Sequence, residues 1–264
     1  MAKTDIAWTQ AVWNPITGCT KCSSGCLNCY AERMTKRMVG MEQPKYKNGF
    51  NVSAHEEDLQ IPFSWKKPKS IFVNSMSDLF HEDVPIDFIK KVFEVMSNTP
   101  HHSYQVLTKR DERLKRIASK LPWSDNIWMG VSVENQDSVG RIDNLLATPA
   151  KNKMISFEPL VGEIAKFPTT GIDWIIVGGE SGPKDKVRKL EAAWVRTLRD
   201  IAIKNSIPFF FKQWGTPESN PLVVKRYEGV SIKAFLEAAD PLPGLRKGGS
   251  RLDGEYWHQI PNEN

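Results

Sequence analysis

The sequence lacks any apolar run long enough to cross a membrane. A transmembrane helix needs roughly 18 or more consecutive apolar residues, and no stretch of the 264-residue chain reaches that length. The first residues also lack the apolar segment of a secretory signal. These absences argue against a membrane-spanning or secreted protein, and we expect the chain in the cytoplasm.

Glycine-rich phosphate loops and the nucleophile elbow are missing as well. The chain has no Gly-x4-Gly-Lys-Ser/Thr loop, no Gly-x-Gly-x-x-Gly after a strand and no Gly-x-Ser-x-Gly turn. These motifs mark P-loop NTPases, dinucleotide-binding folds and α/β-hydrolases. The net charge of +5 is mildly basic and permits an anionic substrate such as a nucleotide or a nucleic acid.

Histidine is sparse and shows no metal-ligand spacing. The five histidines include no pair placed on one face of a helix. We expect His101, His102 and His258 at the surface. Only His81, which follows Asp78 closely, is a candidate for a functional site.

Cysteine is absent from the whole chain except for one stretch of eleven residues. That stretch holds Cys19, Cys22, Cys26 and Cys29. Thiolates gather in this way when they bind one metal centre, because the metal brings their sulfurs together. The function of the chain is therefore expected to depend on this loop.

The spacing of the cysteines permits several metal centres. Three of them, either Cys22 or Cys19 together with Cys26 and Cys29, can hold three irons of a [4Fe–4S] cluster and leave the fourth iron open to a small molecule. A zinc site would pair all four, but only three residues separate the two Cys-x2-Cys knuckles, against about 15–20 in zinc ribbons. Disulfides are disfavoured because no secretory signal is present.

The Cys-x3-Cys-x2-Cys spacing of Cys22, Cys26 and Cys29 resembles that of the radical S-adenosylmethionine (SAM) superfamily. The resemblance implies that the open iron binds the amino and carboxylate groups of SAM. One-electron reduction of SAM then yields a 5′-deoxyadenosyl radical.

Short apolar, β-rich runs alternate with amphipathic stretches along the chain. The near-continuous apolar runs are typical of strands buried on both faces of a parallel sheet. The predicted strands are Ala11–Thr17, Ile71–Ser75, Tyr104–Thr108, Ile127–Val133, Lys153–Phe157, Trp174–Val177 and Pro208–Phe211. The predicted helices are Tyr30–Val39, Ile86–Ser97, Asp111–Leu121, Ser138–Leu146 and Ala192–Lys204.

This order predicts an α/β fold, which could close as a partial or complete (β/α) TIM-like barrel or open as a doubly wound sheet, with the cysteine loop after its first strand. That placement resembles radical SAM enzymes, in which the cluster loop follows the first strand of a partial barrel, and this resemblance implies a barrel of the radical SAM type. We expect the barrel to span residues 1–215. Residues 40–66 form an insertion with little periodicity. Residues 216–264 form a C-terminal extension that packs on the barrel and contains a short helix, Ser231–Ala239.

Polar residues follow the predicted strands, where barrel enzymes place their chemistry. The residues expected to bind a cofactor are Asn74, Ser75, Ser77, Asp78, Ser132, Glu134, Gly178 and Gly179. The residues expected to act in catalysis are Lys109, Glu158, Glu180 and Lys212. The lysines can pair with a carboxylate or a phosphate, and the glycines let the backbone approach a ligand closely.

The position of these groups matters for their roles. In radical SAM folds the end of the second strand receives the SAM ammonium, and here that end offers Asn74, Ser75, Ser77 and Asp78. Gly178-Gly179-Glu180 resembles the Gly-Gly-Glu motif that serves this ammonium. It falls on the sixth strand, so the role is not transferred to it.

The chain also resembles a phage-associated, radical-SAM-like family that occurs in bacterial genomes. The matching segments span nearly the whole chain and include Trp13–Cys19, Gly25–Glu32, Asn74–Phe80, Leu107–Arg110, Ile155–Leu160, Gly178–Gly182 and Phe210–Gly215. The family pattern Gly-Cys-x6-Cys-x2-Cys-Tyr-Ala-Glu falls on Cys19, Cys26 and Cys29. Cys22 is an addition to it.

This resemblance implies a radical SAM enzyme, an isomerase or another nucleobase-modifying type. The substrate implied is an amino-acid-modified thymidine in phage DNA or a related nucleoside. An electron donor such as flavodoxin or ferredoxin and, for a phage protein, the host cytoplasm are implied as well. The resemblance favours Cys19 over Cys22 as the third cluster ligand.

Two other functions remain open from the sequence. One is a zinc- or cluster-stabilised nucleic-acid-binding protein without SAM chemistry. The other is a hydrolase or nuclease that uses Asp78, Glu134 and Glu158, although no spacing in the sequence specifically supports it.

Overall fold

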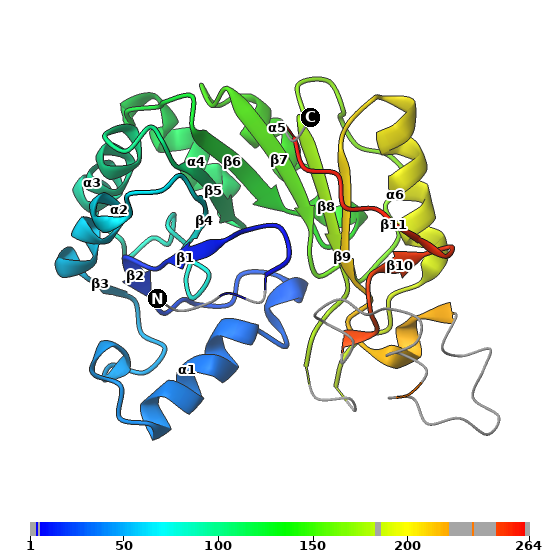
Figure 1. Ribbon diagram of the computed structural model, residues 1–264, viewed down its shortest axis with the longest axis horizontal. Helices are drawn as coiled ribbons and strands as arrows, with labels where there is room; N and C mark the ends of the chain where they lie inside the picture. Colours follow the sequence, from blue (N-terminus) through cyan, green and yellow to red (C-terminus); the bar gives the residue numbers. More distant parts are fainter. Residues whose placement is uncertain (1–3, 5, 183–185, 222–233, 235–246, 262–264) are drawn as a thin grey trace.

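The computed structural model describes residues 4, 6–182, 186–221, 234 and 247–261. Its centre is one curved sheet of seven parallel strands, which forms a partial barrel (Figure 1). The strands lie in the order β1-β4-β5-β6-β7-β8-β9. Their bounds are β1 Ala11–Trp13, β4 Ser70–Val73, β5 Ser103–Thr108, β6 Ile127–Ser132, β7 Asn152–Phe157, β8 Trp174–Gly178 and β9 Phe209–Gln213. The predicted mixed α/β fold with a parallel sheet is confirmed.

Five longer helices accompany the strands, as the sequence predicts. They are α1 Tyr30–Gly40, α3 Ile86–Ser97, α4 Asp111–Ile117, α5 Arg141–Leu146 and α6 Ala192–Lys204. Two are shorter than predicted because 3-10 turns replace part of them. Helix α4 continues as η4 Ala118–Lys120, and a turn capped by Asn135, η5 Gln136–Ser138, precedes α5. In the described chain, the segment between β7 and β8 contains no helix.

The first predicted strand, Ala11–Thr17, is wrong as a single element. Pro15 lacks a backbone N–H and interrupts the ladder. Strand β1 pairs in parallel with β4, whereas β2 (Ile16–Thr17) turns away and pairs antiparallel with β3 (Ser53–Ala54). The predicted insertion 40–66 is therefore tied to the barrel beside the cysteine loop. It also contains η2 Pro44–Tyr46, η3 Glu56–Gln60 and α2 Ile61–Ser64.

Two apolar cores lie on the two faces of the sheet. The larger one packs the outer face against the helices. The smaller one fills the inside of the partial barrel and includes Trp8, Trp128, Trp174 and Phe210. The Trp8 ring lies 4.8 Å from Phe72 and 6.3 Å from Trp174, edge to face. The interior is thus solid at this level, and a cavity remains above it, at the carboxyl ends of the strands.

The end of the chain runs along β9 (Figure 1). The backbone N–H of Phe211 donates to Trp257 O at 2.7 Å, and Phe210 forms an antiparallel bridge with His258. A short hairpin, β10 Arg251–Leu252 and β11 Glu255–Tyr256, precedes this segment, and η6 Pro217–Ser219 follows β9. The predicted helix Ser231–Ala239 falls almost entirely outside the described residues.

The expected surface position of His102 is wrong. His102 is buried, and its ring centre lies 3.9 Å from that of His101. A hydrogen bond between Nε2 and Pro62 O at 3.2 Å compensates part of the cost of burying the imidazole. His258 is half-buried and stacks on Phe210 at 4.7 Å. His101 is exposed, as expected.

Among the described residues, no helix is long and apolar enough to span a bilayer.

Candidate functional site

A cavity of about 300 Å³ opens at the carboxyl ends of the strands, beneath the cysteine loop. All four cysteines line it. Most of the predicted site residues line it too, namely Asn74, Ser75, Ser77, Asp78, Lys109, Ser132, Glu158, Gly179, Glu180 and Lys212. Glu134 and Gly178 do not. The fold therefore gathers residues from six strand ends around one space, as expected for a barrel enzyme.

The cysteine loop starts at a fixed point on the barrel. Gly18 has φ +82° and forms a parallel bridge with Ser77, and a Cβ there would overlap Asn51 O. Only glycine adopts this conformation without strain. The next N–H, from Cys19, donates to Phe50 O at 3.1 Å. The position of Cys19 is thus set by backbone contacts.

Thr20 fastens the loop to the ends of β4 and β5. Its Oγ1 accepts a hydrogen bond from Arg110 Nη2 at 2.9 Å and lies 2.8 Å from His81 Nε2. The Asp83 N–H donates to His81 Nδ1 at 3.1 Å, so a neutral His81 carries its proton on Nε2 and donates to Thr20. Burial lowers the pKa of His81 and favours this neutral form.

Ser23 and Gly25 fasten the middle of the loop to the end of β6. Ser23 Oγ donates to Glu134 Oε1 at 2.6 Å. A Cβ on Gly25 would overlap the Glu134 side chain, so the absence of a side chain lets the loop lie directly on this carboxylate.

Glu180 fastens the far end of the loop to β8. Its carboxylate accepts hydrogen bonds from Asn28 Nδ2 at 3.0 Å and from the Arg188 N–H at 3.0 Å, and it forms an ion pair with the Arg188 guanidinium. Arg188 Nη2 also donates to Ser24 O at 2.9 Å. Glu180 is 3% exposed, and its charge is compensated by Arg188 from the segment after β8 and by Asn28 from the loop. Although burial raises it, the pKa of Glu180 stays below its usual value because of Arg188 and Asn28.

The four thiols are not paired in disulfides. Cys19, Cys26 and Cys29 are half-buried, whereas Cys22 is exposed. Burial, with the nearby Asp78 carboxylate, raises the pKa of Cys19 to about 12. A hydrogen bond from the Cys22 thiol lowers the pKa of Cys26 to about 4 and raises that of Cys22.

Cations stand beside these sulfurs. Arg110 Nη2 lies 3.8 Å from Cys19 Sγ, and the charge of Lys109 helps to lower the pKa of Cys26. Within the described residues, no group of three or more His, Cys, Asp or Glu is arranged to hold a single metal ion. An iron–sulfur cluster attaches each cysteine to a different iron, so it does not require the sulfurs to converge on one ion.

Ion pairs link the strand ends around the cavity. Glu134 lies 2.9 Å from Lys109 Nζ and 2.8 Å from Arg141 Nη1. Burial alone would raise its pKa, but these two cations and Ser23 keep it below the usual value. Glu158 Oε1 lies 2.9 Å from Lys212 Nζ, and Ser156 Oγ donates to Glu158 Oε2 at 3.1 Å. The ammonium of Lys109 is therefore held by the Glu134 carboxylate, which does not line the cavity, whereas both members of the Lys212–Glu158 pair line it.

The chain matches the family model described as "Protein of unknown function (DUF5131)" over residues 3–261. The chain belongs to the DUF5131 family. No curated protein and no solved structure matches it. The function of this DUF5131 chain must therefore be argued from its own site.

Hydrogen bonds already occupy most of the predicted cofactor-binding groups in this DUF5131 chain. Asp78 accepts from Thr108 Oγ1 at 2.7 Å and from the N–H groups of Lys109 and Phe80. Ser77 Oγ donates to Ile16 O, while Ser75 Oγ donates to Asn14. These three side chains and Asn74 are the ones expected to receive SAM. Of the four, Asn74 is the one that keeps an unused hydrogen-bond donor. Its Nδ2 has no partner among the described residues, and its φ is +58°.

Two further polar residues of the cavity were not predicted. Trp8 Nε1 and Gln213 Oε1 are buried and have no hydrogen-bond partner among the described residues. Both side chains line the same cavity as Asn74. Gln213 could have been found because it follows Lys212 at a strand end. Trp8 could not, because it precedes the first strand and reaches the site only when the barrel curves.

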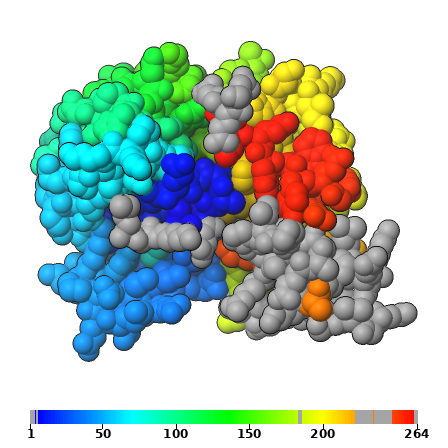
Figure 2. All heavy atoms as spheres, in the orientation of Figure 1, coloured from blue at the N-terminus to red at the C-terminus, as the bar shows by residue number. Residues whose placement is uncertain are grey.

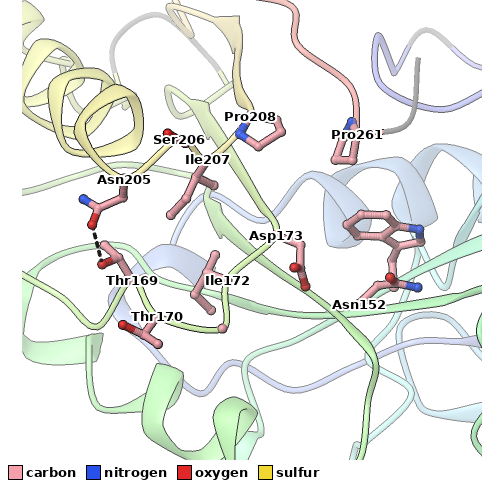
Figure 3. A pocket seen from close by; sticks show the side chains of 12 residues that line it. Asn152, Thr169, Thr170, Ile172, Asp173, Asn205, Ser206, Ile207, Pro208 and Pro261 are labelled. Atoms are coloured by element: carbon pink, nitrogen blue, oxygen red, sulfur yellow. Dashed lines mark hydrogen bonds between the residues drawn. The ribbon is translucent and has the colours of Figure 1, made fainter. Parts of the chain in front are cut away.

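A second hollow, of about 510 Å³, lies at the opposite end of the strands (Figure 3). Some of its polar side chains bond to one another or to the backbone. Thr169 Oγ1 lies 3.1 Å from Asn205 Oδ1 (Figure 3), and the Lys153 N–H donates to Asp173 at 2.8 Å. None of the predicted site residues lines it. Because barrel enzymes act at the carboxyl ends of their strands, we assign the site to the cavity beneath the cysteine loop.

Proposed function

We propose that this protein is a radical SAM enzyme that modifies a nucleobase. One observation carries the proposal: half-buried Cys19, Cys26 and Cys29 share a wall of the cavity at the carboxyl ends of a parallel partial barrel. Glu158 and Lys212 line the same cavity. A reactive group held by the cysteines would therefore meet a substrate held by the strands.

The residues that would hold a [4Fe–4S] cluster are Cys19, Cys26 and Cys29. Cys19 is fixed by its backbone and sits beside Arg110, whereas Cys22 is exposed and hydrogen-bonds to Cys26. When bound, such a cluster supplies the electron that splits SAM into methionine and a 5′-deoxyadenosyl radical. The electron comes from outside the chain, from a donor such as flavodoxin or ferredoxin.

The contacts that remain open favour a small set of residues for SAM. Asn74 Nδ2 is a donor that finds no partner in the described part of the chain, and a donor of this kind fits a carboxylate. Ser132 also lines the cavity. Glu134, Asp78 and Glu180 accept several hydrogen bonds each, so their role is to position the loop and the strand ends rather than to bind the ligand.

The cavity brings a charged pair and aromatic rings together. Lys212 Nζ lies 2.9 Å from Glu158 and 5.7 Å from the centre of the Trp8 ring, and Trp8 packs on Phe72. A flat heterocycle fits this setting, because its faces can stack on aromatic rings while its edge bonds to the charged pair. Glu158 and Lys212 are the groups we assign to substrate binding and catalysis.

The size of the cavity limits what can enter. About 300 Å³ is at the lower end for small-molecule sites. A nucleoside can enter directly, whereas a base in DNA has to leave the stack first. An amino-acid-modified thymidine in phage DNA remains the substrate that the resemblance suggests.

Chemical analysis of the reconstituted protein tests the cluster. The chain is purified, reconstituted anaerobically with iron and sulfide, and analysed for iron, sulfide and zinc. We expect about four irons and four sulfides per chain, together with an electron paramagnetic resonance signal of the reduced cluster that changes when SAM is added. Stoichiometric zinc without a cluster would instead favour a zinc-stabilised nucleic-acid-binding protein.

A further inference from the structure

Exposed apolar side chains gather around the cysteine loop and α1. Seven large apolar residues are exposed in the described chain, and four of them lie between residues 27 and 41. These four are Leu27 (60% exposed), Tyr30 (51%), Val39 (42%) and Met41 (55%). A concentration of this kind on one short segment marks an interaction site, whereas single exposed apolar residues do not.

Helix α1 presents one exposed face. Tyr30, Arg33, Arg37 and Met41 recur at intervals of three and four residues and so share this face. The buried residues of α1 are only Ala31 and Thr35, whereas α3 buries six apolar side chains. In Figure 1 the helix lies to one side of the sheet, and its atoms form the lower left of the surface in Figure 2. We call Leu27, Tyr30, Arg33, Arg37 and Met41 the α1 face.

The charge around this face is net positive, although Lys45 pairs with Asp58 from outside the segment. Residues 21–47 carry six lysines and arginines against two glutamates. Arg33, Lys36 and Arg37 are exposed, and Lys36 shares Glu32 with Lys21. Met, Tyr and Arg are the residues enriched in protein–protein interfaces. The composition therefore fits a protein partner with an acidic surface.

The α1 face is continuous with the cysteine wall. Leu27 follows Cys26 directly, and Tyr30 follows Cys29 and lines the cavity. Arg33 Nη2 donates to Ser181 O at 2.9 Å at the rim. A partner seated here is therefore brought against the outside of the loop that carries the cysteines.

We propose that the α1 face is the docking surface for a small acidic electron-transfer protein. This inference rests on the proposed function, because only a redox centre held by the cysteines needs such a partner. The transfer moves one electron from the reduced centre of the partner, which is oxidised, to the centre held by the loop; no bond to either protein forms or breaks. Exposed Leu27 and Met41 favour a protein over a single-stranded nucleic acid, because nucleic acids are bound by cations and by aromatic rings that stack on the bases rather than by aliphatic side chains.

Binding tests the surface without any SAM chemistry. Oxidised flavodoxin, an acidic probe, is titrated into the protein by calorimetry at about 50 and about 300 mM salt. We expect Arg37→Glu and Met41→Asp to weaken binding about tenfold at low salt, with a smaller effect of Arg37→Glu at high salt. The matched control is Lys120→Glu, an exposed lysine that precedes β6 at the other end of the strands, and it should bind normally. Equal affinity of all variants would overturn the proposal.

Reduction kinetics separate this inference from the proposed function. With the reconstituted cluster, Arg37→Glu should slow bleaching by reduced flavodoxin about tenfold and leave bleaching by dithionite unchanged. If neither reductant acts because no cluster forms, the proposed function fails, and the binding result still decides on the surface. If Arg37→Glu weakens binding of a single-stranded DNA oligonucleotide and not of flavodoxin, the surface is a nucleic-acid interface and the proposal is wrong.

Discussion

The carboxylates beside the cavity differ in whether they are available to a ligand. Glu134 and Glu180 are enclosed by arginine, lysine and loop donors, and their pKa values are lowered as a result. Glu158 has one cation, Lys212, at 2.9 Å and faces the cavity. A hydrolase that uses Asp78, Glu134 and Glu158 together is disfavoured, since two of the three are held by other groups.

Single cysteine substitutions test which thiols hold the cluster. Cys19→Ala, Cys26→Ala and Cys29→Ala should each lower the iron bound after anaerobic reconstitution by about tenfold or more, because each removes a ligand. Cys22→Ala is the matched control and should retain nearly all of it, because Cys22 is exposed whereas the other three thiols are half-buried. Normal loading of Cys19→Ala together with loss in Cys22→Ala would reverse the assignment.

The cysteine loop is an element with little secondary structure of its own apart from η1 (Ser24–Cys26), and contacts with four strand ends hold it in place. Thr20 meets His81 and Arg110, and Ser23 meets Glu134. With the hydrogen bond from Asn28 to Glu180, these contacts come from the segments that follow β4, β5, β6 and β8. Side chains of the barrel thus hold the loop on several sides.

Removing Glu180 should release the far end of this loop. Glu180→Ala leaves Arg188 and Asn28 without their partner, and we expect the free energy of unfolding to fall by about 2–4 kcal/mol. Hydrogen exchange of residues 22–29 should also become faster. Glu163→Ala, at an exposed glutamate, is the control and should change the unfolding free energy by less than about 0.5 kcal/mol. Unchanged hydrogen exchange of residues 22–29 in Glu180→Ala would contradict the role of Glu180 in holding the loop.

Gly179 is required by the packing of β8 against the end of β9. A Cβ at this position would overlap the backbone oxygen of Trp214, which cannot move aside like a side-chain tip. We expect Gly179→Ala to lower the free energy of unfolding by about 1–3 kcal/mol or more. At Gly140 a Cβ meets nothing within 4 Å, so Gly140→Ala should leave the free energy of unfolding unchanged. Urea titration of both variants measures the difference. Equal effects of the two substitutions would show that the close approach is not needed.

The helices and strands could be predicted because their periodicity is local. The continuous apolar run Trp174–Val177 predicts a buried strand, and the amphipathic pattern of Ile86–Ser97 predicts a helix with one buried face. The pairing of β2 with β3 could not, because it joins residues 36 or more positions apart and depends on the break at Pro15. The same holds for the site: the cysteines are a local pattern, whereas the contact of Ser23 with Glu134 spans 111 residues.

At the scale of the whole molecule, buried histidines link folding to pH. Burial is the main cause that lowers the pKa of His55, His81 and His102. When the pH falls below about 6.5, the ordinary histidine value, the unfolded chain therefore binds more protons than the folded one. The unfolding free energy must then fall as the pH falls.

Urea unfolding at pH 7.5 and 5.5 measures this dependence. We expect a lower midpoint at pH 5.5, and a smaller difference between the two pH values in His102→Gln. Below about pH 4.5 the loss should steepen, since Glu134, Glu180 and Asp253 have lowered pKa values and become protonated first in the unfolded chain. A midpoint that does not change between pH 7.5 and 5.5 would contradict the role of the buried histidines.

The central claim is that the cysteine wall and the strand ends form one radical SAM site. The most direct measurement is the formation of 5′-deoxyadenosine after the reconstituted protein is mixed anaerobically with SAM and dithionite. We predict 5′-deoxyadenosine from the wild-type protein and from Cys22→Ala, and none from Cys19→Ala. A protein that carries a full cluster and yet forms no 5′-deoxyadenosine would contradict the account.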